Sequence, residues 1–281
     1  MHKLVHCFLF FSFLLLVVGC GGTQGRNAES DIPPKAIRPE VKTPEVAGNR
    51  KAGDRDSFII EGTEYAFRWC PPGTFMMGKK PGEVAVTLSR GFWMLETEVT
   101  QAMWMSVMGD NPSHFKGANL PVGTVSWDDC QEYIKQLNDM NVAPAGYKFS
   151  LPTGAQWEYA CRAGTTTAYH FGDTLTREQA NINGGGGRTR DVGSFPANAW
   201  GLKDMHGNVW EWCQDCYRDG DYPSGAVMDP TWPARGSYRV IRGGSWLNLA
   251  EGCRSADQIS LDPAFRYSFI GLRLSLVFEG R

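Results

Sequence analysis

The stretch between Gly164 and Arg239 is the feature that most limits how this chain can fold. It shows neither the 3.6-residue period of a helix nor the alternation of a strand, although glycines and tryptophans recur along it. A long segment without such elements normally counts against a compact domain. Because the chain holds 33 glycines and 10 tryptophans, we predict a packed, loop-rich region pinned by large aromatic side chains. This disfavours a helical bundle or a regular α/β sheet.

The composition is that of an ordinary globular protein and gives no indication of nucleic-acid binding or of a polybasic membrane patch. The 281 residues are 42% hydrophobic and 21% charged, which suits a globular protein with a sizeable core. The formal net charge of −2 gives no sign of a nucleic-acid-binding protein or of a polybasic membrane patch. We therefore expect no nucleic-acid partner.

The first twenty residues resemble an export signal. Lys3 precedes an apolar run from Val5 to Val18 that is too short for a typical membrane span. The run ends in Val17-Val18-Gly19-Cys20, which resembles a bacterial lipobox. Residues 1–19 are then a lipoprotein signal peptide, and Cys20 is the lipidated residue that anchors the chain to the membrane. An ordinary secretory signal with a chance cysteine is the alternative.

Export sets the expected location and the redox setting of the chain. We expect a lipid-anchored protein of the bacterial cell envelope, exposed on the outer membrane. Residues 20–56 are polar, contain four prolines and lack aromatic residues, so they predict a flexible tether, with one folded domain over residues 57–281. Disulfides are plausible outside the cytosol, but the spacing of the cysteines does not give their pairing. The six cysteines of the domain are Cys70, Cys130, Cys161, Cys213, Cys216 and Cys253.

Two helices are well signalled. Ser126 precedes a helix predicted over residues 127–140, with Asp129 at the third helical position, and Thr153 precedes one over residues 154–163, with Gln156 at that position. A weaker helix is predicted over residues 100–107. The expected strands are residues 57–60 paired with 65–69, residues 85–88 paired with 91–94, and residues 238–241 and 271–276.

Six segments of the domain follow one another in a recognisable order. They are Pro71 to Gly78, Glu98 to Gln101, Val125 to Asp129, Leu151 to Arg162, Gly201 to Trp212, and Arg242 to Trp246 followed by Gly271 to Arg273. Each is weak by itself, but together they cover nearly the whole domain and resemble the formylglycine-generating-enzyme or sulfatase-modifying-factor family. The resemblance implies an α+β protein with a C-type lectin fold, sparse secondary structure and long irregular loops.

The resemblance also bears on catalysis. Family members that make formylglycine carry a cysteine pair shortly after the Gly-Gly-Ser turn, which binds copper(I). Here Asn248 holds the place of the first cysteine, and residues 249–252 contain no thiol. Soft thiolates suit copper(I) and an amide does not, so we expect neither copper nor enzymatic activity. The alternative is a formylglycine-generating oxidase that acts on a cysteine in sulfatases.

Several other residues gain a role only from the resemblance or from short motifs. Cys161 and Cys253 match a family disulfide, and Ser245 matches a family active-site serine, although it is also an ordinary turn residue. Cys213-x-x-Cys216 lacks the context of a redox or zinc motif, so a structural bridge or free thiols are expected. His170 and His206 are expected to be hydrogen-bonded loop residues.

A structural calcium site is the one cofactor that the sequence favours. The side chains of Asp204 and Glu211 and the carbonyls of Gly207 and Val209 resemble a family calcium site, and hard oxygen ligands suit this ion. The alternative is that the two carboxylates cap backbone amides in a turn.

A second family calcium site is in doubt. It would use Asn181 and the carbonyls of Ile182 and Phe195, but Gly193 replaces its carboxylate.

Residues 247–269 contain the predicted ligand-binding surface. Twelve positions alternate with scaffold residues without helical or strand periodicity, which argues against their being core. Seven of them are large and apolar or aromatic, and an exposed patch of this kind usually marks a binding site. The positions are Leu247, Leu249, Gly252, Asp257, Ile259, Ser260, Leu261, Ala264, Phe265, Tyr267, Ser268 and Phe269.

This segment resembles the variable region of proteins that are diversified by a retroelement, such as the variable lipoproteins of Treponema. All twelve residues belong to the set that randomised adenines in asparagine-type codons can produce. The resemblance implies a surface-displayed binding protein whose partner is an unknown protein or glycan on another cell or a host surface. A fixed-partner envelope lipoprotein is the alternative.

Overall fold

The structure is a computed structural model that describes residues 50–184, 186–217, 225–231 and 236–279. The predicted signal peptide, the lipidated Cys20 and the tether up to residue 49 lie outside these residues. Within the described part of the chain, no helix is both long and apolar enough to cross a membrane.

Three α-helices form, and all three were predicted. They are α1 (Gln101–Met108), α2 (Trp127–Asp139) and α3 (Gly154–Arg162). Ser126 and Thr153 each precede a helix with a complete capping box. The cap side chain accepts a bond from the main-chain N–H three residues on, and the Asp129 or Gln156 side chain accepts one from the N–H of the cap residue. These reciprocal bonds satisfy amide groups that the first turn leaves free, which is why four-residue motifs locate the helix starts correctly.

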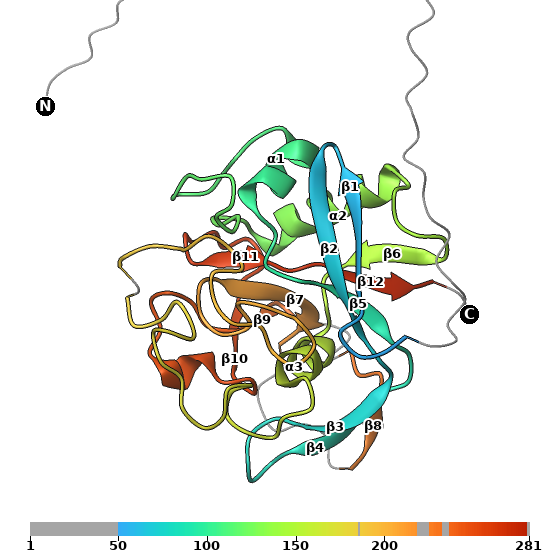
Figure 1. Cartoon of the computed structure of the whole chain (residues 1–281), viewed down its shortest axis with the longest axis vertical. Helices are drawn as coiled ribbons and strands as arrows, with labels where there is room; N and C mark the ends of the chain where they lie inside the picture. The colour runs from blue at the N-terminus through green and yellow to red at the C-terminus, as the bar shows by residue number, and fades with distance from the viewer. Residues whose placement is uncertain (1–49, 185, 218–224, 232–235, 280–281) are drawn as a thin grey trace, which may run out of the picture. The chain divides into compact units, whose positions relative to one another are not determined.

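A five-stranded sheet carries α1 and α2 (Figure 1). Its strands, in spatial order, are β1 (Arg55–Ile60), β2 (Thr63–Cys70), β5 (Phe92–Leu95), β12 (Ser275–Phe278) and β6 (Tyr147–Ser150). The predicted hairpin between the first two strands is confirmed. The predicted boundary of the tether at residue 56 is too late, because the Arg50 guanidinium lies 5.1 Å from the Trp69 ring and Gly53 donates to the Trp69 carbonyl at 2.9 Å.

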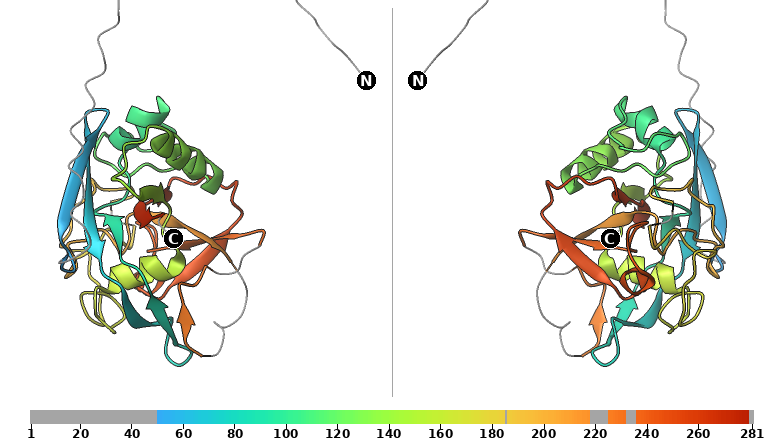
Figure 2. Two further views of the ribbon diagram at one scale, coloured as in Figure 1. Left: turned by 90° about the vertical axis from the view of Figure 1, so that its right-hand side faces the viewer. Right: turned by 90° about the vertical axis from the view of Figure 1, so that its left-hand side faces the viewer.

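Two smaller sheets complete the fold. The four-stranded sheet has the order β10 (Gln258–Leu261), β9 (Arg239–Arg242), β7 (Trp210–Cys216) and β11 (Ile270–Leu272). The three-stranded sheet consists of β3 (Gly73–Met77), β4 (Val84–Leu88) and β8 (Val227–Met228). Helix α3 contacts β3, β7 and β9, so it packs against both sheets (Figures 1 and 2).

Two of the predicted strand arrangements are wrong. Residues 85–88 and 91–94 do form strands, but β4 pairs with β3 whereas β5 pairs with β2 and β12. The predicted single strand at residues 271–276 is divided between two sheets, as β11 and β12. The division falls at Arg273, whose guanidinium group is drawn into a buried ion pair with Glu211. Local periodicity identifies strands but not their partners, since pairing depends on distant segments.

The loop-rich region after α3 is packed, as predicted. Leu202, Met205 and Val209 are fully buried although they belong to no helix or strand. A small cluster that includes Tyr169, Ile182 and Cys253 gives this region an apolar centre of its own.

Arg273 donates hydrogen bonds to three separate segments of the interior. Its Nε and Nη2 atoms donate to the Glu211 carboxylate at 2.8–3.1 Å, and both side chains are almost fully buried. Nη1 donates to the Leu95 carbonyl at 3.1 Å, and Nη2 also donates to the Lys203 carbonyl at 2.8 Å. The Arg273 side chain therefore connects β5, β7 and the loop that precedes β7, where Lys203 lies.

We predict that Arg273→Met lowers the free energy of unfolding by about 3–5 kcal/mol, because it leaves the Glu211 carboxylate buried without its partner. Urea denaturation measures this loss. Arg55→Met is the matched control: its ion pair with Glu64 is about half exposed, so about 0–1 kcal/mol is expected. Equal losses in the two variants would contradict this role of Arg273.

Candidate ligand-binding surface

Half of the predicted contact positions are exposed. Leu247, Leu249, Ile259, Ala264, Phe265 and Tyr267 are exposed, whereas Gly252, Ser260, Leu261, Ser268 and Phe269 are partly buried. Leu261 and Phe269 also pack against the core cluster of α1 and α2. Residues 258–261 form strand β10, so the predicted lack of strand structure in this segment is wrong there.

Asp257 was predicted to be a surface contact, but its side chain lies in the interior. Its side chain is buried, its carboxylate forms an ion pair with Lys79, and its carbonyl accepts a bond of 3.3 Å from Arg242. Asp257 therefore belongs to the scaffold, because a carboxylate is buried in a protein only where a partner balances its charge.

Three aromatic rings form a row beside the start of α2. Tyr267 and Phe269 are stacked with ring centroids 5.1 Å apart, and Phe265 meets Tyr267 edge-on at 5.8 Å. The main chain below them is fixed, because Thr124 donates to the Tyr267 carbonyl at 2.9 Å and Arg266 forms two 2.7 Å bonds with Asp129. Phe265 and Tyr267 are thus exposed on a fixed main chain, and the partly buried Phe269 joins the row to the core.

Leu247 and Leu249 flank a second fixed point, Asn248. The Asn248 side-chain oxygen accepts bonds from Trp210 Nε1 at 3.0 Å and from the Ser245 hydroxyl at 2.7 Å. Trp210 also donates its main-chain N–H to the Phe269 carbonyl at 2.8 Å. Trp210 therefore holds both parts of the surface, a role that the sequence did not reveal.

The predicted calcium residues lie around a buried group of carboxylates. Asp204 and Glu211 are almost fully buried, and so is Glu98, whose Oε2 atom has no hydrogen-bond partner in the described structure. Burial raises the pKa of Asp204 to about 6, and the pKa of Glu98 is raised by burial and by the charge of Asp204. Arg273 is the buried cation that faces them.

Two carboxylates and two main-chain carbonyls would supply the hard oxygen ligands that calcium prefers. Glu211 accepts three donors, two from Arg273 and one from Trp157 at 2.6 Å, against about four lone-pair positions on a carboxylate. Calcium would also offset the excess of buried negative charge. No group of three or more His, Cys, Asp or Glu side chains is arranged for a metal within the described ranges, so the Gly207 and Val209 carbonyls would have to supply ligands.

The second predicted calcium set lies beside the first. The side-chain oxygen of Asn181 is buried without a hydrogen-bond partner, and the Gly193 N–H donates to the Asp204 carboxylate at 2.5 Å. Gly193, which stands where the family has a carboxylate, thus contacts the carboxylate of Asp204 in the first set.

The predicted disulfide between Cys161 and Cys253 is absent. Both are free, buried thiols, and burial raises the pKa of each to about 12. His206 lies between them: its Nε2 atom is 3.8 Å from the Cys161 sulfur and its Nδ1 atom is 2.7 Å from the Cys253 carbonyl. The thiol of Cys161 instead contacts the Ser255 hydroxyl at 3.5 Å, so each cysteine has its own polar neighbours.

His206 and the Cys213-x-x-Cys216 motif are the remaining candidate residues. His206 is a hydrogen-bonded residue, as predicted, and burial lowers its pKa to about 3. Cys213 and Cys216 are both buried in β7, not at the start of a helix, and burial raises the pKa of Cys213 well above its ordinary value. The environment of Cys213 therefore disfavours a reactive thiolate, whereas the Cys216 sulfur accepts a 3.2 Å bond from the Arg239 guanidinium.

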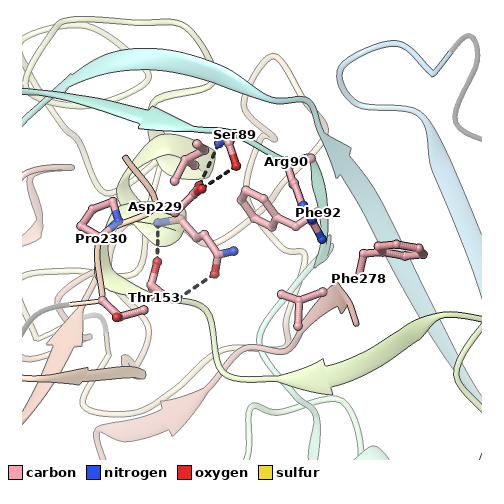
Figure 3. Close-up of a pocket in the computed structure, with 12 residues that line it drawn as sticks. Ser89, Arg90, Phe92, Thr153, Asp229, Pro230 and Phe278 are labelled. Atoms are coloured by element: carbon pink, nitrogen blue, oxygen red, sulfur yellow. Dashed lines mark hydrogen bonds between the residues drawn. The ribbon is translucent and has the colours of Figure 1, made fainter. Parts of the chain in front are cut away.

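A cavity of about 430 Å³ opens elsewhere on the molecule, near the start of α3 (Figure 3). Its polar groups bond to one another: Ser89 donates to Asp229 at 2.8 Å, and Thr153 donates to Gln156 at 2.9 Å. None of the twelve predicted contact residues lines it. We assign it no chemistry.

Comparison with known proteins decides the family. Residues 61–276 match the sulfatase-modifying factor enzyme 1-like domain. The chain belongs to this family. It is 33% identical over 223 residues to the formylglycine-generating enzyme of Thermomonospora curvata, covering 69% of this chain and 67% of that protein. It is 31% identical over 254 residues to the chaperone protein LppX of Paenibacillus barcinonensis, covering 72% and 82%.

Solved structures of the family confirm the predicted α+β, C-type lectin fold. Treponema denticola variable protein 1 superposes with a TM-score of 0.72 at 27% identity, covering 79% of this chain and 98% of that one. PvdO from Pseudomonas aeruginosa, with a TM-score of 0.67 at 24% identity, supports the fold. The chain spans only 24% of the serine/threonine-protein kinase pkn1 of Chlamydia caviae, to which it is 41% identical over 159 residues.

We propose that calcium is a structural ion of this domain, held by Asp204, Glu211 and the Gly207 and Val209 carbonyls. Calcium at a hundredfold excess over its dissociation constant should then stabilise the fold by about 2.7 kcal/mol. Thermal denaturation with calcium and with a chelator measures the difference. Asp204→Asn should remove most of it, whereas the exposed Asp191→Asn should retain it. A calcium effect that survives in Asp204→Asn would contradict this site.

Proposed function

We propose that this protein binds a ligand through the exposed apolar side chains of residues 247–269. Twelve large hydrophobic side chains are exposed among the described residues, and five of them lie in this segment: Leu247, Leu249, Ile259, Phe265 and Tyr267. This concentration is the observation that carries the proposal, because exposed apolar patches usually mark binding sites.

The support of these side chains suits a surface whose sequence can vary. Their main chain is fixed by Asn248, Arg266 and Thr124, none of which is among the twelve contact positions. Exposed side chains between such anchors can be exchanged with little effect on the scaffold, as in other proteins that carry recognition on loops. The likeness to Treponema denticola variable protein 1 supports the same proposal.

A binding role is favoured over an oxidase role by the chemistry at residue 248. An amide stands where copper-binding family members have a thiol, and its oxygen is engaged by Trp210 and Ser245. Ser245, the counterpart of a family active-site serine, is fully buried. The proposal therefore includes no catalysis, no copper and no catalytic residue.

The setting of this surface follows from the N-terminal sequence. With Cys20 lipidated, the domain would be displayed from the outer membrane of a bacterial envelope. Its partner would be a protein or glycan on another cell or a host surface, and not a nucleic acid. A fixed partner is the alternative, for which the segment would be uniform between strains.

We predict that replacing Phe265 and Tyr267 together with alanine abolishes binding while the domain stays folded. Both rings are more than two fifths exposed, so the loss of stability should fall well short of the roughly 3–5 kcal/mol of a buried aromatic. Protein and glycan arrays probed with the full chain measure binding. Tyr238→Ala is the matched control, since that ring is 52% exposed but lies outside the segment. Unchanged binding in the double variant would refute the proposal.

The oxidase alternative has a direct test. A copper(I) titration followed by incubation with a cysteine-containing sulfatase peptide should give neither stoichiometric copper binding nor oxidised peptide, because the thiol pair is missing. Catalytic turnover of the peptide would overturn the view that this protein only binds.

A further inference from the structure

A second pocket lies next to the proposed ligand-binding surface, in the loops before β7. Its volume is about 510 Å³. Figure 1 shows these loops gathered on the side of the molecule that carries β10 and β11. The pocket is lined by Lys116, Gly117, Leu120, Gly186, Arg188, Thr189, Arg190, Asp191 and Ser194.

The charge of this pocket is opposite to that of the whole chain. Three of its side chains are cationic and one, Asp191, is anionic, whereas the chain carries a net charge of −2. In the described part of the structure, Lys116, Arg188 and Arg190 form no ion pair within 4.0 Å. Lys116 uses one of its three donors on the Asn111 carbonyl, at 2.5 Å. Most of the donor capacity of the pocket is therefore available.

Thr189 also lines the pocket, but its hydroxyl group does not face the open space. The residue is only 4% exposed, and its Oγ1 atom is itself buried and has no hydrogen-bond partner among the described residues. A ligand in the pocket would therefore contact the three cationic side chains and not this hydroxyl.

The loop that carries these residues is held in place by the scaffold. Arg190 donates its main-chain N–H to the Asn208 side chain at 3.0 Å, and Val192 donates to the Asn119 carbonyl at 2.9 Å. The Arg188 carbonyl accepts a bond of 3.1 Å from Asn181. The main chain that carries these cationic side chains is thus fixed by the scaffold.

The pocket is joined to the proposed binding surface by a short chain of contacts. The Arg188 guanidinium lies 5.5 Å from the centre of the Phe115 ring, which meets the Trp246 ring edge-on at 5.8 Å. Gly184 donates to the Trp246 carbonyl at 2.7 Å. Because Trp246 precedes the exposed Leu247, these contacts run from the pocket to the first residue of the proposed surface.

We propose that this pocket binds a sulfate or phosphate ester of the ligand. The extension to the ligand rests on the proposed function, whereas anion binding by the pocket does not. Two arginines and a lysine offer more donors than the two oxygens of one carboxylate can accept. A tetrahedral ester, with three free oxygens, matches them better, and arginine suits such oxyanions.

Isothermal titration of the full chain with sodium sulfate, sodium phosphate and sodium acetate tests the pocket. Sulfate or phosphate should bind saturably with a stoichiometry of one, and acetate should bind at least tenfold more weakly. Arg190→Gln and Lys116→Gln should each weaken binding about tenfold, and Thr189→Val should leave it unchanged, because the hydroxyl does not face the pocket. Lys135→Gln, an exposed cation on α2, is the matched control and should leave binding unchanged.

Each outcome separates this proposal from the previous one. The Phe265 and Tyr267 double variant should keep its affinity for the free anions, because its rings do not line the pocket. If the pocket variants lose free-anion binding and array binding together, one ligand uses both regions. The proposal is overturned if acetate binds as tightly as sulfate and phosphate, if Lys135→Gln is as weak as Arg190→Gln, or if no anion binds saturably.

Discussion

The buried ion pair between Arg273 and Glu211 is the interaction on which the rest of this structure depends. It replaces the middle of what would otherwise be one long C-terminal strand, and so it divides that strand between two sheets. The same guanidinium also bonds to the Leu95 and Lys203 carbonyls. Since an unpaired charge at this depth is strongly unfavourable, the sheets and the loops between them must form together.

This arrangement explains how a domain with few regular elements can hold long loops in place. The loops are fixed by side-chain amides and indoles and not by strand pairing. Asn208 bonds to Asn181, to Glu98 and to the Arg190 main chain, and Trp210 bonds to Asn248. Such buried networks are rigid when their members are paired. The proposed apolar surface and the cationic pocket both lie on loops that this network supports.

The residues that anchor this segment and the residues that it exposes differ in polarity. Asn248 and Arg266, at anchoring positions, are engaged in hydrogen bonds, while five of the seven large apolar residues between the anchors are exposed. Exposed apolar patches of this kind usually mark binding sites. Sequence position alone misplaces Asp257, because it alternates with anchors along the chain yet its buried carboxylate pairs with Lys79.

The sequence by itself determined the helices, the first hairpin, the family and half of the exposed contact positions. These rest on local signals, namely capping boxes, periodicity and ordered motifs, which act over a few residues. It did not determine the strand partners of β4 and β12, the anchoring role of Trp210, the burial of Glu98 or the cationic pocket. Arg188 and Arg190 follow the glycine run of residues 184–187, in a stretch without helix or strand periodicity. These features needed the tertiary structure, because each depends on groups that meet across long sequence separations, and the free energy of burying a charge or an amide is fixed by those distant partners.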